Sequence, residues 1–215
     1  MKHFTKSDFD ELEKITRTNL INSISGYKSA NLIGTISNSG ATNLAIFSSV
    51  VHIGANPPLL GFVMRPVEEV PRHTYENIKE NEVFTINHVR DSFVENAHFT
   101  SAKFDKNVSE FAACGLTEQF HEDFAAPFVA ESRIKIGLKL ADEIPVNINK
   151  TILIIGEIEH LFLPENALLE DGNVNLNSAE TACISGLDGY HEVGEAVRFP
   201  FAKVSKMPEF KIIIL

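Results

Sequence analysis

The sequence contains no tryptophan and only three tyrosines, against sixteen phenylalanines. A planar ligand held by this protein would therefore rest on Phe side chains and backbone rather than on an indole. Long apolar runs are absent too: no stretch approaches the ~18 residues that a membrane-spanning helix needs. The first residues, 1–14, have no apolar stretch and carry acidic side chains early, so we expect no signal peptide there.

Cysteine is scarce. Cys114 and Cys183 lie far apart, form no CxxC motif and have small apolar neighbours without an adjacent base. We predict structural thiols, no disulfide framework and a reducing, cytoplasmic location. The eight histidines are scattered without HxH, HxxxH or HExxH spacing, so a metal site is not expected.

Several nucleotide and nucleophile motifs are missing. The sequence has no GxGxxG, no GxxxxGK[ST] and no GxSxG. A Rossmann dinucleotide domain, a P-loop and a nucleophile elbow are therefore unsupported. No arrangement of side chains suggests a catalytic triad or a carboxylate pair.

Positive charge is in the minority. Lys and Arg total 19 against 29 for Asp and Glu, which gives a net charge of −10. This balance disfavours nucleic acid as a partner, although a small local anion site remains compatible with it. With 215 residues, 44% hydrophobic, and no repeat or linker-like tract, the chain is predicted to be one domain, 1–215.

Strand patterns dominate the predicted elements. The exception at the start is a helix over Ser7–Asn19, with Ser7 as N-cap and an apolar stripe expected to cover a sheet. A second, short helix is expected to begin at Pro71 and run to Glu80, and short helices and loops are expected over 90–128. Strands are predicted at residues 30–37, 42–51, 59–64, 83–89, 132–141, 151–163, 196–201 and 211–215. Because most of these strands lack helical crossovers between them, we predict an antiparallel barrel or sandwich.

Residues 42–49 form the first informative pattern. Thr42, Asn43, Ala45, Ser48 and Ser49 put small and hydroxyl-bearing side chains on a predicted strand. A flat ligand could lie close to such a backbone and accept its hydrogen bonds. The other interpretation is a tightly packed crossing of two sheets, and these residues alone do not exclude it.

A cluster of positive groups is the second pattern. Arg65 is followed by Arg72, His73 and Thr74 at a predicted helix N-terminus. Free N–H groups, the helix dipole and basic side chains together suit a phosphate. The alternative is a capped helix with surface arginines. Taken together, the two patterns describe a ligand with a heteroaromatic end and a phosphate end; flavin mononucleotide (FMN) fits, and other phosphorylated heterocycles remain open.

The sequence also resembles the flavin reductase-like family, in a region from about Ser25 to Gly156. The resemblance lies in the order of short segments rather than in any one of them. The matching segments are Ala30–Thr35, Asn43–Ser48, Asn56–Leu59, Arg72–Ile78, Val83–Asn87, Ser109–Phe111 and Gly115–Thr117. Many members of that family have Pro in place of Ile46, and Lys-Asp-Thr in place of Arg72-His73-Thr74.

What the resemblance implies is a mainly β fold: an antiparallel split β-barrel of Greek-key type with a few peripheral helices. It further implies a homodimer with FMN near the subunit interface. Asn43, Leu44 and Ala45 would line the flavin ring through their backbone. Further cofactor-binding residues are expected at the ring edge (Asn31), at the ribityl chain and phosphate (Ser48, Ser49), and at the phosphate itself (Arg65, Arg72, His73, Thr74).

The function expected from this resemblance is an FMN-binding oxidoreductase. It would take electrons from NAD(P)H, a transient co-substrate, and pass them to flavin, a ferric complex or a partner protein. No catalytic side chain is predicted; His98 and Tyr190 are possible walls of the site. The alternatives are a non-catalytic flavin-binding electron carrier or storage module, and a split barrel that has lost its flavin. No membrane partner is expected.

Overall fold

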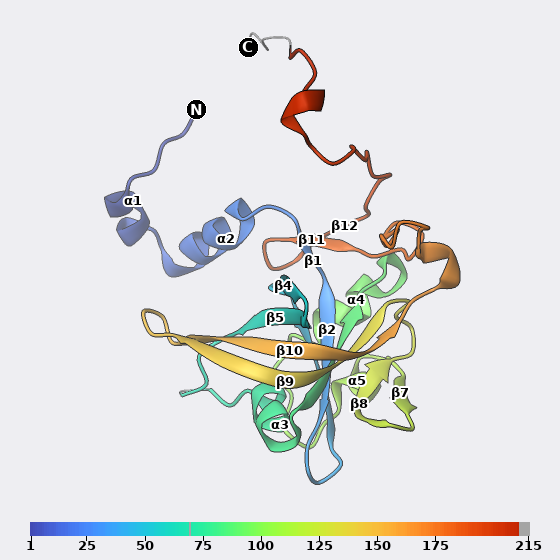
Figure 1. The fold of residues 1–215 in the computed structure, drawn as a ribbon. Helices are drawn as coiled ribbons and strands as arrows, with labels where there is room; N and C mark the ends of the chain where they lie inside the picture. Colours follow the sequence, from blue (N-terminus) through green and yellow to red (C-terminus); the bar gives the residue numbers. More distant parts are fainter. Residues whose placement is uncertain (69, 211–215) are drawn as a thin grey trace.

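A seven-stranded antiparallel sheet forms the centre of the computed structural model, which describes residues 1–68 and 70–210 (Figure 1). Its strand order is β3-β2-β6-β9-β10-β5-β4. The strands are β2 (Asn31–Ile36), β3 (Thr42–Phe47), β4 (Val51–Ala55), β5 (Pro58–Met64), β6 (Val83–His88), β9 (Lys135–Val146) and β10 (Thr151–Phe162). Each pair of neighbours is antiparallel, which confirms the predicted strand arrangement.

Two smaller sheets and several short helices surround this centre. One small sheet contains β1 (Lys28–Ser29), β11 (Cys183–Ser185) and β12 (Gly189–His191). The other is a hairpin of β7 (Glu118–His121) and β8 (Phe124–Val129). The helices are α1 (Lys6–Glu11), α2 (Lys14–Ile24), α3 (His73–Asn81), α4 (Val94–Phe99) and α5 (Glu110–Ala113), with single 3₁₀ turns at 91–93, 165–167 and 204–206. No helix in the part of the chain that the structure describes is long and apolar enough to span a membrane.

The core explains why the central strands are so apolar. Five of the six residues of β2 are buried, because α3 packs on this strand from one side and β8 from the other. One apolar cluster includes Phe62, Phe84 and Ile154 from β5, β6 and β10. A second lies under α4 and α5 and includes Leu44 and Phe111. The sheet thus gives the site below a rigid support.

The predicted N-terminal helix is wrong in its limits and in its role. The chain forms two helices, and Leu12 between them is extended. The N-cap is Thr5 rather than Ser7, because the Asp8 carboxylate accepts the Thr5 backbone N–H. Neither helix contains a buried residue, so the apolar stripe does not cover the sheet.

Other sequence expectations also need correction. The strand predicted over 42–51 is two strands, β3 and β4, separated at residues 48–50. Within the region expected to hold short helices and loops, the chain forms a hairpin, β7–β8. Residues 196–201 form no strand: they are exposed and have no neighbouring strand. The strand predicted at 211–215 lies outside the described residues.

Candidate functional site

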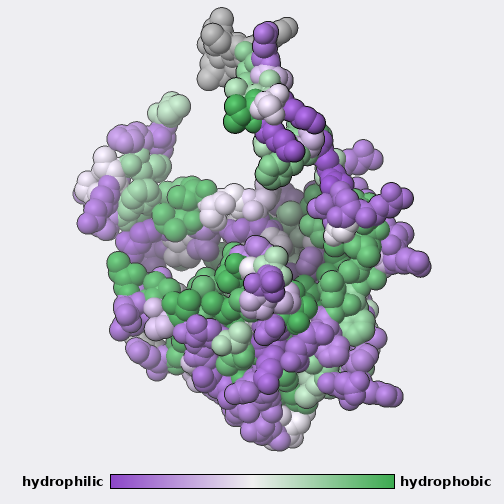
Figure 2. Space-filling model, viewed as in Figure 1, coloured by the Kyte–Doolittle hydropathy of each residue, from purple (hydrophilic) through white to green (hydrophobic). Residues whose placement is uncertain are grey.

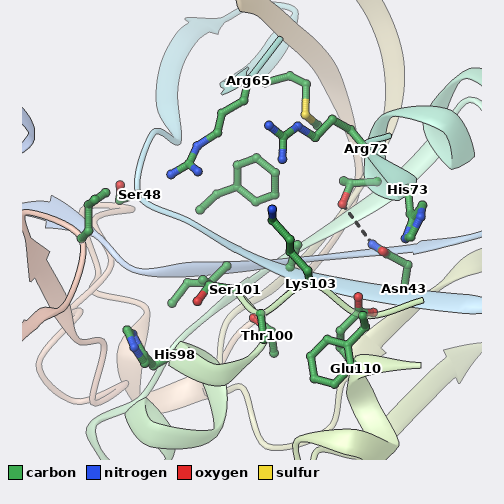
Figure 3. Close-up of a pocket in the computed structure, with 18 of the residues that line it drawn as sticks. Asn43, Ser48, Arg65, Arg72, His73, His98, Thr100, Ser101, Lys103 and Glu110 are labelled. Carbon is green, nitrogen blue, oxygen red and sulfur yellow. Dashed lines mark hydrogen bonds between the residues drawn. The ribbon is translucent and has the colours of Figure 1, made fainter. Parts of the chain in front are cut away.

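A cavity of about 900 Å³ opens at the side of the sheet where β3 ends. Five parts of the chain line it: β3 with the break that follows, the end of β5 with the start of α3, the segment from His98 to Lys106, Glu110 at the start of α5, and α2 with the β11–β12 turn. The side chains that define its two ends come from the first three of these parts (Figure 3).

Most of the residues predicted to bind a cofactor lie in the wall of this cavity. They are Asn43, Ala45, Ser48, Ser49, Arg65, Arg72, His73 and Thr74. Two predicted residues lie elsewhere. The Leu44 side chain is fully buried in the core, and Asn31 is fully buried with its amide donating to Ser29. Folding thus brings the two sequence patterns, 43–49 and 65–74, to one space.

The start of α3 provides one end of the cavity. Arg72 is the N-cap, and the first intrahelical bond runs from the Glu76 N–H to the Arg72 carbonyl, 2.9 Å. The N–H groups of His73, Thr74 and Tyr75 therefore have no carbonyl partner within the helix. Backbone donors and the positive end of the helix dipole together favour an anion here.

Three cationic side chains point toward the same space. Figure 3 shows the Arg65 and Arg72 guanidinium groups facing the Lys103 ammonium from across the cavity. Burial, and then the neighbouring Arg65 charge, lower the pKa of Arg72. Mutual repulsion of this kind is relieved when an anion binds between the charges. The arrangement can therefore hold a phosphate.

A buried hydrogen-bond network fixes the start of α3 against the sheet. The Asn43 side-chain amide donates to the Thr74 hydroxyl at 3.0 Å and to the Thr35 hydroxyl at 3.3 Å. Asn77, one turn further along α3, also donates to the Thr35 hydroxyl. Asn43 and Thr74 thus bond to each other, and their side chains set the position of the helix terminus.

Strand β3 provides the other end of the cavity. It is the last strand of the seven-stranded sheet, so one of its backbone edges has no strand partner. The Leu44 N–H on that edge donates to the Glu110 carboxylate at 2.9 Å. Because alternate residues of a strand face the same edge, the Ile46 N–H points the same way, and Ile46 lines the cavity. This edge can donate a backbone hydrogen bond to a flat ligand.

Glu110 is a buried carboxyl group in this wall. Burial raises its pKa, while the hydrogen bonds from the Leu44 and Glu110 N–H groups and the charge of His73 oppose that shift. Glu110 belongs to the family-like segment Ser109–Phe111, but no sequence pattern predicts its contact with β3.

The segment from His98 to Lys106 contributes further cavity-lining residues that the sequence patterns do not predict. Thr100, Ser101 and Lys103 line the cavity from the side opposite Arg65. Lys106 anchors this segment to α3 through an ion pair with Glu76, 2.7 Å. The sequence signal that could have identified this segment is the pair Lys103 and Lys106, two positive residues close together in an acidic chain.

His98 and Tyr190, expected as possible walls, lie side by side. The His98 Nδ1 and the Tyr190 hydroxyl are 3.2 Å apart. His98 lines the main cavity, and both residues line a smaller adjoining hollow of about 270 Å³. Burial, followed by the Asp188 charge, raises the pKa of Tyr190 to about 12, so its hydroxyl stays protonated at neutral pH.

The fold is an antiparallel split barrel, as predicted. A solved structure from Shewanella frigidimarina, described as a putative flavin reductase with a split barrel domain, is 50% identical to this chain with a TM-score of 0.90. The match covers 94% of this chain and all of that one. The family model described as "flavin reductase like domain" matches residues 25–178. The chain therefore belongs to the flavin reductase-like family.

Two further relatives are more distant. Flavoredoxin of Desulfovibrio vulgaris is 26% identical with a TM-score of 0.71, over 84% of this chain and 93% of that one. An uncharacterised protein of Halalkalibacterium halodurans is 28% identical, over 82% of this chain and 87% of the relative.

Proposed function

We propose that this protein is an FMN-dependent oxidoreductase that takes electrons from NAD(P)H and delivers them to free flavin, a ferric complex or a partner protein. The observation that carries the proposal is a single cavity with an anion site at one end and an open strand edge at the other. Membership of the flavin reductase-like family supports the same assignment.

The residues at the anion end fit the phosphate of FMN. Arg65, Arg72 and Lys103 supply positive charge, and the first N–H groups of α3 supply directed donors. Hydrogen bonds from charged donors to a phosphate are shorter and stronger than neutral ones. In a chain of net charge −10, this local cluster makes binding of a single phosphate compatible with exclusion of polyanions.

The residues at the other end fit the polar edge of a flavin ring. Ala45, with its small side chain, lets a flat ligand approach the backbone, and the Ile46 N–H faces outward. Glu110 holds this strand edge in place through the Leu44 N–H. When bound, FMN supplies the redox chemistry by accepting a hydride and passing electrons on. The protein positions the ring and places N–H donors where negative charge develops.

The electron donor would reach the ring through the open side of the cavity. The sequence has no dinucleotide-binding fingerprint, so NAD(P)H is proposed to bind transiently against the exposed flavin face. We also propose a homodimer and a cytoplasmic location for this protein. Both cysteines are free thiols, in agreement with a cytoplasmic location.

A second candidate is an electron carrier with no pyridine-nucleotide activity. The proposed FMN site does not separate the two candidates, because a carrier and a reductase need the same contacts with FMN; the carrier is kept because a flavoredoxin is among the similar structures.

The visible spectrum of the purified protein tests both candidates. We expect an absorbance near 450 nm (about the usual oxidised-flavin band) in the purified protein or after addition of FMN, and bleaching on anaerobic addition of NADH or NADPH. A bound flavin that both nucleotides leave oxidised would favour the carrier. A protein that takes up no FMN would contradict the proposed function.

A further inference from the structure

The small hollow beside the main cavity is a side compartment with a composition of its own. It is lined by Val94, Glu95, His98, Asp188 and Tyr190. Its volume of about 270 Å³ is close to the lower end of the range of ligand pockets, about 300 Å³. His98 and Asp188 line the main cavity as well, so the two spaces share a wall. Figure 3 shows His98 on the side of the cavity away from Arg72.

Two aromatic rings form one corner of this hollow. The rings of His98 and Tyr190 stand at 90° to each other, with their centroids 5.8 Å apart. The contact of 3.2 Å between the His98 Nδ1 and the Tyr190 hydroxyl holds the pair together. An aromatic face attracts a positive charge through the quadrupole of the ring, and this is how proteins recognise many organic cations. The corner therefore favours a flat ligand, and a cationic one in particular.

Two carboxylates, those of Glu95 and Asp188, complete the hollow. Hydrophilic side chains cover much of the face shown in Figure 2, so exposed acids by themselves mark no site. These two have a different setting, because the five ion pairs within residues 1–68 and 70–210 all use other carboxylates. The same part of the chain gives neither side chain a hydrogen-bond donor. Two carboxylates without a partner thus face one space whose other walls are aromatic and apolar.

We propose that this hollow binds a flat organic cation of one ring, such as an arylamidinium or an N-alkylpyridinium, and rejects anions of the same shape. The faces of Tyr190 and His98 would contact the ring, and Glu95 and Asp188 would balance its charge. The main cavity and its side compartment are then opposite in polarity. Arg65, Arg72 and Lys103 hold an anion at one end, and the acidic hollow holds a cation at the other.

This polarity has a consequence for the choice of substrate. A ligand in the hollow would lie beside the occupant of the main cavity, because His98 and Asp188 belong to both walls. A molecule that exchanges electrons with a flavin bound there would present a neutral or positive ring to the hollow, and an aromatic carboxylate would be disfavoured. The consequence for substrates rests on the proposed function, whereas the binding of a cation does not.

The experiment uses three probes of nearly the same shape and different charge. Benzamidine is a cation, benzamide is neutral and benzoate is an anion. Each is titrated into the ¹⁵N-labelled full-length protein, with and without FMN, and followed by NMR at low salt. Benzamidine is expected to bind at least tenfold more tightly than benzoate, with benzamide in between. The shifted resonances should belong to residues 94–98 and 188–190, and high salt should narrow the difference between the probes.

The variant Glu95→Gln/Asp188→Asn tests the carboxylates directly. Both groups are exposed and partly screened by solvent, so we expect each to contribute about threefold to the affinity for benzamidine. The double variant should therefore bind benzamidine about tenfold more weakly and benzamide within twofold of the wild type. Glu122→Gln/Asp123→Asn is the matched control. It removes the same charge from the exposed β7–β8 turn, which lines neither space, and should follow the wild type.

Equal affinities for the three probes, shifts centred elsewhere, or an equal loss in the control variant would each overturn the proposal. So would a protein to which benzamidine does not bind. A protein that binds benzamidine in this order but takes up no FMN would contradict only the proposed function. One that binds FMN and shows no dependence on probe charge would contradict only the cation site.

Discussion

Arg72 occupies three positions at once: it is the N-cap of α3, it neighbours a second guanidinium, and it lines the cavity. Its Nε donates to the Pro66 carbonyl at 3.3 Å, which orients the side chain. The terminal nitrogens remain directed toward Arg65 and Lys103 (Figure 3). This placement makes Arg72 the best single residue for testing the anion site.

We predict that Arg72→Ala weakens FMN binding at least tenfold but leaves riboflavin binding within about twofold. The reason is that riboflavin lacks the phosphate, and one charge-assisted hydrogen bond contributes about 1.5–3 kcal/mol. Lys103→Ala should show the same difference between the two ligands. Fluorescence titration measures both affinities, and Lys139→Ala, outside the cavity, is the control. Equal losses for FMN and riboflavin would show that the phosphate lies elsewhere.

His88 is a buried titratable group that we expect to contribute to the response of the fold to acid. Burial lowers its pKa to about 4, and its Nδ1 lies 3.2 Å from the Thr181 hydroxyl. The unfolded chain binds a proton at a pH near 6.5, whereas the folded chain keeps this imidazole neutral. The contribution of this group to the free energy of unfolding is therefore fully present above about pH 6.5 and is lost as the pH falls toward 4.

We predict that this residue contributes on the order of 3 kcal/mol to the pH dependence of the unfolding free energy between pH 7 and 4. Urea unfolding of the wild type and of His88→Gln at several pH values isolates the contribution. His52→Gln, at an exposed position, is the control and should follow the wild type. An unchanged pH dependence in His88→Gln would refute this assignment.

At the scale of elements, β2 of the central sheet packs very closely against β8 of the β7–β8 hairpin. A Cβ on Gly34 would lie 2.3 Å from the Pro127 carbonyl oxygen and 2.6 Å from the Thr85 hydroxyl. The Thr85 hydroxyl itself donates to that carbonyl at 2.7 Å. Neither the backbone oxygen nor this bonded hydroxyl can move away easily, so the strands require glycine here.

We predict that Gly34→Ala lowers the unfolding free energy by about 3 kcal/mol, because relieving the overlap would force β2 and β8 apart. The matched variant is Gly54→Ala, whose added Cβ would meet its nearest atom at an ordinary 3.5 Å. That variant should stay within about 1 kcal/mol of the wild type. Thermal or urea unfolding measures both, and similar stabilities of the two variants would contradict the prediction.

Several strands and part of the candidate site could be predicted from local sequence patterns. Strands β2, β5 and β6 were predicted to within about two residues, because β-branched runs and turn residues mark them. Arg65 and Arg72 could be placed together from the sequence for a similar reason: they are close in sequence and precede a helix start, and both line the cavity. The β7–β8 hairpin escaped, because burial of 124–129 comes from long-range packing that no local pattern records.

Glu110 and Lys103 illustrate why the rest of the site was not predictable. Glu110 accepts the N–H of Leu44, which is 66 residues away in sequence. Lys103 faces Arg65 and Arg72 only because the chain between them crosses the sheet and returns. Such contacts depend on topology. The prediction for the N-terminal helices failed for the opposite reason. Their local apolar pattern is present, but it packs on no part of the sheet of its own chain.

At the scale of the whole molecule, ligand binding and folding are linked. A ligand that binds only the folded chain stabilises it by about 2.7 kcal/mol at 100 times its dissociation constant. For a chain of this length we predict a rise in the thermal midpoint of roughly 5–10 °C at that FMN concentration. Circular dichroism in the far ultraviolet follows the transition without interference from flavin fluorescence. Riboflavin at the same multiple of its own dissociation constant should give the same rise, and a midpoint insensitive to FMN would contradict the linkage.

The Glu110 carboxylate at the edge of β3 has a consequence for solubility. An unpaired strand edge is a template on which another extended chain can add, and this is a common route to aggregation. Here the Leu44 N–H is already bonded, and the group that bonds it is acidic and nearly buried. A second strand would have to displace Glu110 from its buried position, whereas a small flat molecule needs only the neighbouring Ile46 N–H. The edge therefore discriminates between ligand and polypeptide, and it protects the cofactor-free chain from growing into an intermolecular sheet.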